Sequence, residues 1–164
     1  MSVNYFVIGS YYYWEDKPGE DMLDDMMSHN VMSVGWGMEA GLDLTNLYGK
    51  KSPGEITDYL KNKGLSIKSY SNLKRFLSLK PGDIVAIKKW DMRDGNGSII
   101  VRAYARVVRR QGSIYHFDKA SLGHMMNAEY LKKNVSNKFP YNYSQAIHQV
   151  TKPDRIRIIF GPVL

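Results

Sequence analysis

The spacing of hydrophobic positions changes several times along the N-terminal half of the chain, and each change predicts a different element. β-Branched and aromatic residues crowd positions 3–12, a composition typical of a buried strand. Methionine and leucine then recur at helical spacing over 20–29, where acidic residues in the first turn suit the helix dipole. A second strand is predicted over 31–36, and two amphipathic helices are predicted over 53–64 and 69–79.

Predicted strands dominate the C-terminal half. The clearest alternation runs over 98–109, where apolar residues occupy one face and Arg102, Tyr104 and Arg106 occupy the other. An Asp-Gly-Asn-Gly run at 94–97 predicts a hairpin turn before this strand. The other predicted segments are strands over 84–90, 113–117 and 155–160, a short helix over 127–133 and a loop over 134–144.

This order of elements predicts an α+β fold, because a strand, a helix, a strand and two helices precede a run of strands. We expect a single domain over residues 1–164, since a chain of 164 residues suits one domain and buries enough apolar surface to fold unaided. The expected architecture is a curved mixed β-sheet or partial β-barrel with flanking helices.

Composition narrows the cellular setting and the class of partner. The chain has no cysteine, which excludes disulfides, thiolate metal sites and a cysteine nucleophile. Its apolar runs are too short to span a membrane and its N-terminus lacks the pattern of a signal peptide, so we expect a cytoplasmic protein. With 23 Lys and Arg against 16 Asp and Glu, the formal charge of +7 favours DNA or RNA as a partner.

Few patterns point to catalysis or to a cofactor. The four histidines, His29, His116, His124 and His148, have no pairing at metal-ligand spacing, so we expect no metal site. The sequence contains neither a Gly-x-Ser-x-Gly elbow nor a glycine-rich phosphate loop, so we expect no cofactor. These observations favour a binding module over an enzyme.

Aromatic residues follow the first two predicted strands where each strand ends. If the two ends are neighbours, their rings can hold a flat base between ring faces while polar groups read its edge. The predicted base pocket consists of Ser10, Tyr11, Tyr12, Trp14, Ser33, Gly35 and Trp36. The alternative is that these rings pack against the β core with their polar tips in water.

Basic residues with an interleaved tyrosine occupy the outward face predicted for strand 98–109. Arginine suits contacts with phosphate and tyrosine suits stacking on a base. The predicted nucleic-acid backbone surface consists of Lys88, Lys89, Arg102, Tyr104, Arg106, Arg109 and Arg110. The alternative is an ordinary solvated sheet face.

Several short motifs together resemble the PUA-like superfamily, with EVE-type and YTH-like modified-base-binding domains as the most similar branches. The matching segments span residues 3 to 110 and are 5–11, 34–37, 43–44, 73–76, 80–87 and 99–108. The resemblance implies a curved sheet or partial barrel and an aromatic pocket that accepts one flipped, often modified, base. The sequence departs at Gly9, where several related pockets carry a lysine.

Two other functions stay open. The ASCH branch of the same superfamily implies a small hydrolase acting on modified nucleosides, with Lys17, Glu20 and Glu39 as candidate catalytic residues. The third hypothesis is a regulatory protein whose acidic predicted helix, 20–28, contacts a protein partner.

Overall fold

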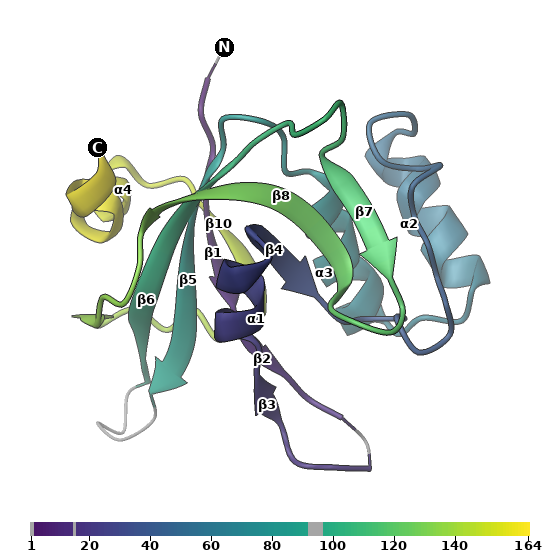
Figure 1. Ribbon diagram of the computed structural model, residues 1–164, viewed down its shortest axis with the longest axis horizontal. Coiled ribbons are helices and arrows are strands. Elements are labelled where there is room, and N and C mark those ends of the chain that lie inside the picture. Colours follow the sequence, from purple (N-terminus) through teal and green to yellow (C-terminus); the bar gives the residue numbers. More distant parts are fainter. Residues whose placement is uncertain (1, 15, 92–96) are drawn as a thin grey trace.

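The computed structural model describes residues 2–14, 16–91 and 97–164, and its fold is α+β with a strongly curled mixed β-sheet (Figure 1). The predicted fold class, a curved mixed sheet with flanking helices, is therefore confirmed. The strands are β1 (Tyr5–Gly9), β2 (Tyr11–Tyr12), β3 (Glu20–Asp21), β4 (Val31–Val34), β5 (Ile84–Asp91), β6 (Ser98–Val107), β7 (Tyr115–Asp118), β8 (Gly123–Lys132), β9 (Asn137–Phe139) and β10 (Ile147–Val150). The helices are α1 (Leu23–Ser28), α2 (Pro53–Asn62), α3 (Ile67–Leu77) and α4 (Pro153–Phe160).

One long bent strand produces much of the curl of the sheet. The strand order is β10-β1-β5-β6-β8-β4, with β1 and β5 parallel and the other neighbours antiparallel. β8 pairs with β4 and β7 through residues 123–127 and with β6 through residues 128–132, so it passes from one part of the sheet to the other. Figure 1 shows this strand arching over the molecule.

Apolar side chains pack on both faces of the sheet. Phe6 and Val7 are consecutive in β1 and point to opposite faces, as the period of two in a strand requires. Phe6 belongs to the core beneath α2 and α3, together with Phe76 of α3. Val7 belongs to a second core together with Phe160 of α4. The helices therefore cover opposite sides of the sheet, as Figure 1 shows.

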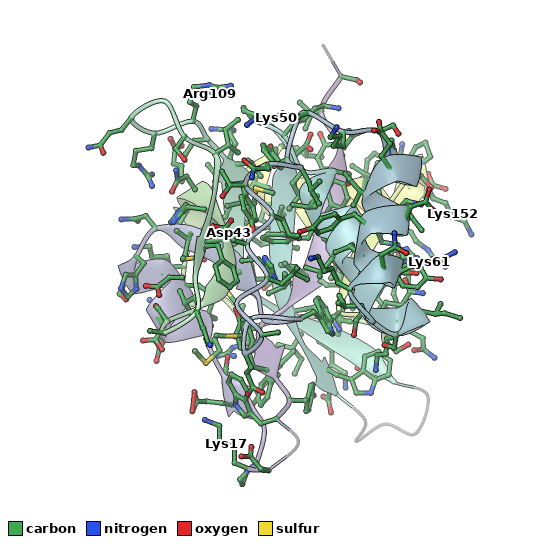
Figure 2. All side chains as sticks on the ribbon, turned by 90° about the vertical axis from the view of Figure 1, so that its right-hand side faces the viewer. Lys17, Asp43, Lys50, Lys61, Arg109 and Lys152 are labelled. Carbon is green, nitrogen blue, oxygen red and sulfur yellow. The ribbon has the colours of Figure 1, made fainter. Side chains whose placement is uncertain are left out.

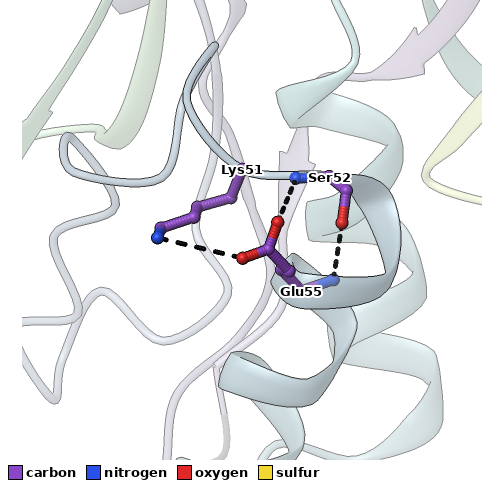
Figure 3. Close-up of polar contacts among 3 residues, drawn as sticks. All are labelled: Lys51, Ser52 and Glu55. Carbon is purple, nitrogen blue, oxygen red and sulfur yellow. Dashed lines mark hydrogen bonds and ion pairs between the residues drawn. The ribbon is translucent and has the colours of Figure 1, made fainter.

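Helix α2 begins with a capping box (Figure 3). Ser52 Oγ accepts a hydrogen bond from the Glu55 backbone N–H at 3.2 Å, and Glu55 Oε1 accepts one from the Ser52 N–H at 3.1 Å. Pro53 supplies a helical φ in the first turn. Lys51 Nζ lies 3.8 Å from Glu55 Oε2, an exposed contact that contributes little to stability. These contacts fix the end of the irregular segment that precedes α2.

The predicted turn between α3 and β5 is present, and a buried carboxylate organises it. Gly82 has a φ of +96°, which favours glycine. Asp83 is 1% exposed, and its two oxygens accept hydrogen bonds from the N–H groups of Asn4 at 3.1 Å and Lys80 at 3.0 Å. The Gly82 N–H donates to the Val107 carbonyl at 2.8 Å. The turn therefore joins the chain before β1 to the end of β6.

The predicted strand over 155–160 is wrong, because this segment forms helix α4. Pro153 presets a helical φ in the first turn. Ile156, Ile159 and Phe160 then fall at i, i+3 and i+4 and pack in the second core. A short run of this kind fits both periods, and the helix buries Ile159 and leaves Ile158 exposed.

Other local predictions also differ from the structure. The helix predicted over 127–133 is wrong, because most of this segment belongs to strand β8. Backbone pairing with β4, β7 and β6 holds β8 in the extended conformation. The loop predicted over 134–144 contains β9, which pairs with β6. The helix predicted over 20–29 starts only at Leu23, because the residues before it pair with β2 as β3. Most of the predicted hairpin turn at 94–97 lies outside the described residues, although β5 and β6 are antiparallel as it requires.

We predict that Tyr104→Phe weakens the docking of α4. The Tyr104 hydroxyl donates a hydrogen bond of 2.6 Å to the Ile159 carbonyl inside the second core. Without this donor the buried carbonyl loses its partner, so the free energy of unfolding should fall by about 1–2 kcal/mol in denaturant titrations. Ile158→Ala changes a side chain of the same helix that is 51% exposed, and it should cost less than about 0.5 kcal/mol. Equal losses in the two variants would contradict the prediction.

Candidate functional site

The ends of the first two predicted strands do meet, but a tyrosine ring fills the space between them. Tyr12 Oη lies 2.7 Å from Ser33 Oγ and also donates to the Leu122 carbonyl. A Cβ at Gly35 would lie 2.9 Å from carbon atoms of the Tyr12 ring, so glycine permits this close approach. Ser10 and Ser33 are both fully buried. The structure thus brings these residues together as a packed cluster.

Of the remaining aromatic residues of the predicted base pocket, Trp14 packs against this cluster. Tyr11 is exposed in β2, and Trp14 packs edge-on against Tyr12 with the ring centroids 5.8 Å apart. Lys17 Nζ lies 4.4 Å from the centre of the Trp14 ring. Trp36 is half-buried against the main core. None of the residues of the predicted base pocket lines either of two cavities, of about 580 and 480 Å³, that lie elsewhere in the described structure.

The fold uses much of the predicted backbone-contact surface internally. The expectation that Tyr104 faces outward beside Arg102 and Arg106 is wrong, because the Tyr104 side chain is fully buried toward α4. Arg102 forms an ion pair with Asp21. Burial alone would raise the pKa of the Asp21 carboxyl, but the hydrogen bond from Arg102 contributes to holding that pKa below its usual range. Arg106 pairs with Glu129 at 3.2 Å.

The other residues of that surface are dispersed over the molecule. Lys88 is buried in β5 and Lys89 is half-buried beside it. Arg110 donates to the backbone carbonyls of Asn30 and Ala128 at 3.1 and 3.0 Å, so part of its guanidinium holds the fold together. Arg109 is exposed and lines a cavity that the sequence did not indicate.

This cavity, which we call the tyrosine cavity, lies between residues 45–50, the C-terminal end of α3 and the turn after β6. Its volume is about 580 Å³, within the range typical of small-molecule sites. Tyr48 and Tyr115 stand in its wall with their rings stacked, the centroids 5.9 Å apart and the planes at 17°. Tyr115 is buried, whereas Tyr48 is half-buried.

Three cations surround the tyrosine cavity. Lys50, Lys80 and Arg109 line it, and all three side chains are exposed. In the described part of the chain, no carboxylate forms an ion pair with any of them. The nearby Asp83 uses its two oxygens on backbone N–H groups. Figure 2 shows Lys50 and Arg109 at one end of the molecule and Lys17 at the opposite end.

A tight turn positions the arginine of this group. Gln111 and Gly112 have φ values of 52° and 78°, the pair of positive angles typical of a two-residue hairpin turn. Arg110 and Ser113 exchange backbone hydrogen bonds of 2.9 and 3.0 Å across this turn. Arg109 Nη1 donates to the Gly112 carbonyl at 3.3 Å, which leaves its other N–H groups for a ligand.

A buried histidine holds Tyr115 in the cavity wall. His124 Nε2 lies 2.6 Å from the Trp36 carbonyl, which only accepts, so Nε2 carries the proton. His124 Nδ1 is then an acceptor, and it receives the hydrogen bond of the Tyr115 hydroxyl at 2.7 Å. The same hydroxyl accepts a hydrogen bond from the Leu44 N–H at 3.1 Å. The ring of Tyr115 is therefore fixed from both sides.

Burial keeps this pair of side chains neutral. Burial lowers the pKa of His124 to about 4, although the Trp36 carbonyl and the charge of Asp43 act in the opposite direction. Burial likewise raises the pKa of the Tyr115 hydroxyl above its ordinary value. Both groups are therefore neutral at neutral pH, and the hydrogen bond between them positions the Tyr115 ring.

Sequence reasoning missed Tyr48, Tyr115, Lys50 and Lys80, because no local pattern marks them as neighbours. They come from three segments that only the fold brings together. Within residues 2–14, 16–91 and 97–164, no group of three or more His, Asp or Glu side chains is placed to hold a metal ion. In the same ranges, no helix has the length and apolar character needed to cross a membrane.

The residues of the two alternative hypotheses lie away from the tyrosine cavity. Lys17 stacks on Trp14, while Glu20 and Glu39 are exposed and do not line the cavity. The acidic predicted helix 20–28 is shorter than expected, and α1 exposes Asp24 and Asp25 to solvent. Catalysis by Lys17, Glu20 and Glu39 stays a hypothesis, and so does protein binding by α1.

We predict that His124 makes stability depend on pH. Between pH 6.5 and about 4, His124 binds a proton in the unfolded chain but stays neutral in the folded one. The free energy of unfolding therefore falls as the pH drops through this window. The loss should reach about 3 kcal/mol in denaturant titrations at several pH values. His124→Gln should flatten this dependence, whereas the exposed-site variant His29→Gln should retain it. An unchanged slope in His124→Gln would sink the prediction.

Comparison with known proteins gives no family for this chain. No protein-family model matches it, and no curated protein sequence matches it significantly. The resemblance to PUA-like domains therefore stays a hypothesis that depends on short motifs. The geometry of the tyrosine cavity is the firmer basis for a functional proposal.

Proposed function

We propose that this domain binds nucleic acid and that the tyrosine cavity receives one unstacked nucleotide. The observation that carries the proposal is the meeting of stacked aromatic rings with three exposed, unpaired cations around one cavity of about 580 Å³ in the described structure. The proposal keeps the nucleic-acid partner expected from the net charge. It moves the nucleotide from the strand-end cluster of Tyr12 to the cavity beside Tyr48.

Each part of a nucleotide has a matching group in the cavity. A base can stack on the half-buried Tyr48, whose other face is supported by Tyr115. Such stacking is worth roughly 1–3 kcal/mol per base and tolerates different bases. Phosphates can contact Lys50, Lys80 and Arg109, which lie around the ring pair.

Fixed geometry supports this role. The Tyr48 hydroxyl donates to the Leu79 carbonyl, and Tyr115 is held by His124 and the Leu44 N–H. Rings that are already in place lose little conformational entropy when a ligand binds. The turn containing Gly112 likewise fixes the backbone next to Arg109 before a ligand binds.

We predict that Lys50→Gln combined with Arg109→Gln lowers the affinity for a fluorescent single-stranded oligonucleotide. Two phosphate contacts on a single strand contribute about 1.4 to the slope of log affinity against log salt, so the affinity should fall by roughly 20-fold near 0.1 M salt. Fluorescence anisotropy at several salt concentrations measures both quantities, with DNA and RNA in parallel.

The matched control removes the same charge elsewhere. Lys17→Gln combined with Lys61→Gln lowers the net charge equally, and both lysines lie away from Lys50 and Arg109 (Figure 2). This variant should lose much less affinity and keep most of the salt slope. If both double variants weaken binding equally, net charge alone accounts for the affinity and the cavity has no special part.

A second prediction concerns the ring of Tyr48. Tyr48→Phe loses the hydrogen bond to the Leu79 carbonyl but keeps the aromatic face, so the affinity for the oligonucleotide should fall only about two- to threefold. Tyr48→Leu removes the face and should lower the affinity by about tenfold, since one stacked base is lost. Equal affinities for the Phe and Leu variants in the same anisotropy assay would argue against a stacked base.

A further inference from the structure

A second cavity opens between β10 and the start of α4, and its lining is polar and basic. Its volume is about 480 Å³. Lys152 and Arg155 supply positive charge, His148 supplies an imidazole, and Ser144 and Thr151 supply hydroxyl donors. No aspartate or glutamate is among the residues that line it. We call it the β10–α4 cavity, and its chemistry suits an anion.

Aromatic contacts hold the arginine of this cavity. The Arg155 guanidinium lies over the Tyr141 ring at 4.6 Å and over the Tyr143 ring at 5.6 Å. Its Nη1 donates to the Tyr143 hydroxyl at 3.0 Å, which uses one of five N–H donors. Among the described residues no carboxylate forms an ion pair with Arg155. The neighbouring Asp154 pairs instead with Arg157.

Positive charges from three elements act on His148 of β10. Its ring stacks on Tyr143 with the centroids 4.2 Å apart. Burial lowers the pKa of His148, and the charges of Arg75 in α3, Arg155 in α4 and Lys88 in β5 lower it further. The field at this imidazole is therefore positive, which a bound anion would relieve.

Lys88, one of these charges, is itself buried. The side chain is 5% exposed, and burial lowers its pKa to about 8, so it is still mostly charged at neutral pH. Its one described side-chain contact is with Trp90, whose ring centre lies 5.7 Å from Nζ. A buried ammonium normally has a carboxylate partner, and the described structure provides none.

The start of α4 adds backbone donors to this site. α4 begins after Lys152, with Pro153 in its first turn, and no side chain caps the first N–H groups. Free N–H groups at a helix N-terminus favour a negative ligand. We propose that the β10–α4 cavity binds a phosphate group, with Arg155 and Lys152 as its ligands, His148 beside it and the start of α4 beneath it.

This site is separate from the tyrosine cavity, and the two cavities share no lining residue. A phosphate of a nucleic-acid backbone and the phosphate of a small metabolite have the same chemistry here. The proposal therefore concerns the phosphate group, and the experiment distinguishes the two sources. The phosphate proposal does not depend on whether the tyrosine cavity binds a nucleotide.

The test follows the imidazole Cε1–H signal of His148 by NMR while inorganic phosphate is added at constant ionic strength, with chloride as the reference. We expect a saturable shift with phosphate alone, together with a rise of the His148 pKa, because a bound anion favours the charged imidazolium. A shift that is not saturable, or that chloride reproduces, would overturn the proposal.

Variants separate binding from a change in folding. Arg155→Gln should weaken phosphate binding by roughly tenfold or more, since a charge-assisted contact is lost. Arg157→Gln removes the same charge from the same helix outside the cavity and should leave binding unchanged. Both variants should retain a native amide spectrum. Equal phosphate affinity in the two variants would refute the assigned site.

Further arms identify the source of the phosphate. A short 5′-phosphorylated oligonucleotide that shifts the His148 signal at lower concentration than inorganic phosphate assigns the site to nucleic acid. A nucleoside monophosphate or inorganic phosphate that binds more tightly than the oligonucleotide assigns it to a small ligand. Lys50→Gln combined with Arg109→Gln should leave this phosphate binding intact, so failure of the tyrosine-cavity proposal would be recognised separately.

Discussion

The hydrogen bonds of neutral His124 join the parts of the fold on which the tyrosine cavity depends. One ring nitrogen donates to the Trp36 carbonyl after β4, and the other accepts from Tyr115 of β7. The Tyr115 hydroxyl in turn receives the Leu44 N–H from the irregular segment before α2. A protonated imidazole could not accept from Tyr115, so burial and neutrality of His124 are required for the wall of the cavity to keep its shape.

Whether a cation is paired depends on whether the fold places a carboxylate within its reach. Arg102 and Arg106 lie on the sheet, where Asp21 and Glu129 are within reach, and they form ion pairs. Lys50, Lys80 and Arg109 lie where segments end, and in the described structure they meet no carboxylate. These three unpaired cations therefore lie away from the sheet face that the sequence favoured. Positions at the ends of elements commonly carry binding residues, because a rigid scaffold holds them in place.

The two cavities suit different kinds of ligand. In the tyrosine cavity, aromatic faces and exposed lysines suit a nucleotide. In the β10–α4 cavity, Arg155 is held by the rings of Tyr141 and Tyr143. Buried Lys88 does not line this cavity, but its charge acts on His148, which does. The first arrangement favours a flat ligand with phosphates, and the second favours a compact anion.

The sequence by itself determined the α+β class, the curved mixed sheet, most strands of the N-terminal half and the glycine turn before β5, because periodicity and turn residues act locally. It also located Tyr12, Ser33 and Gly35 near one another. Only the tertiary structure decided that 155–160 is a helix and that the Tyr12 ring closes its own pocket. Tertiary contacts also decided which cations remain unpaired, since ion pairs and cavities join residues from distant segments that no local pattern relates.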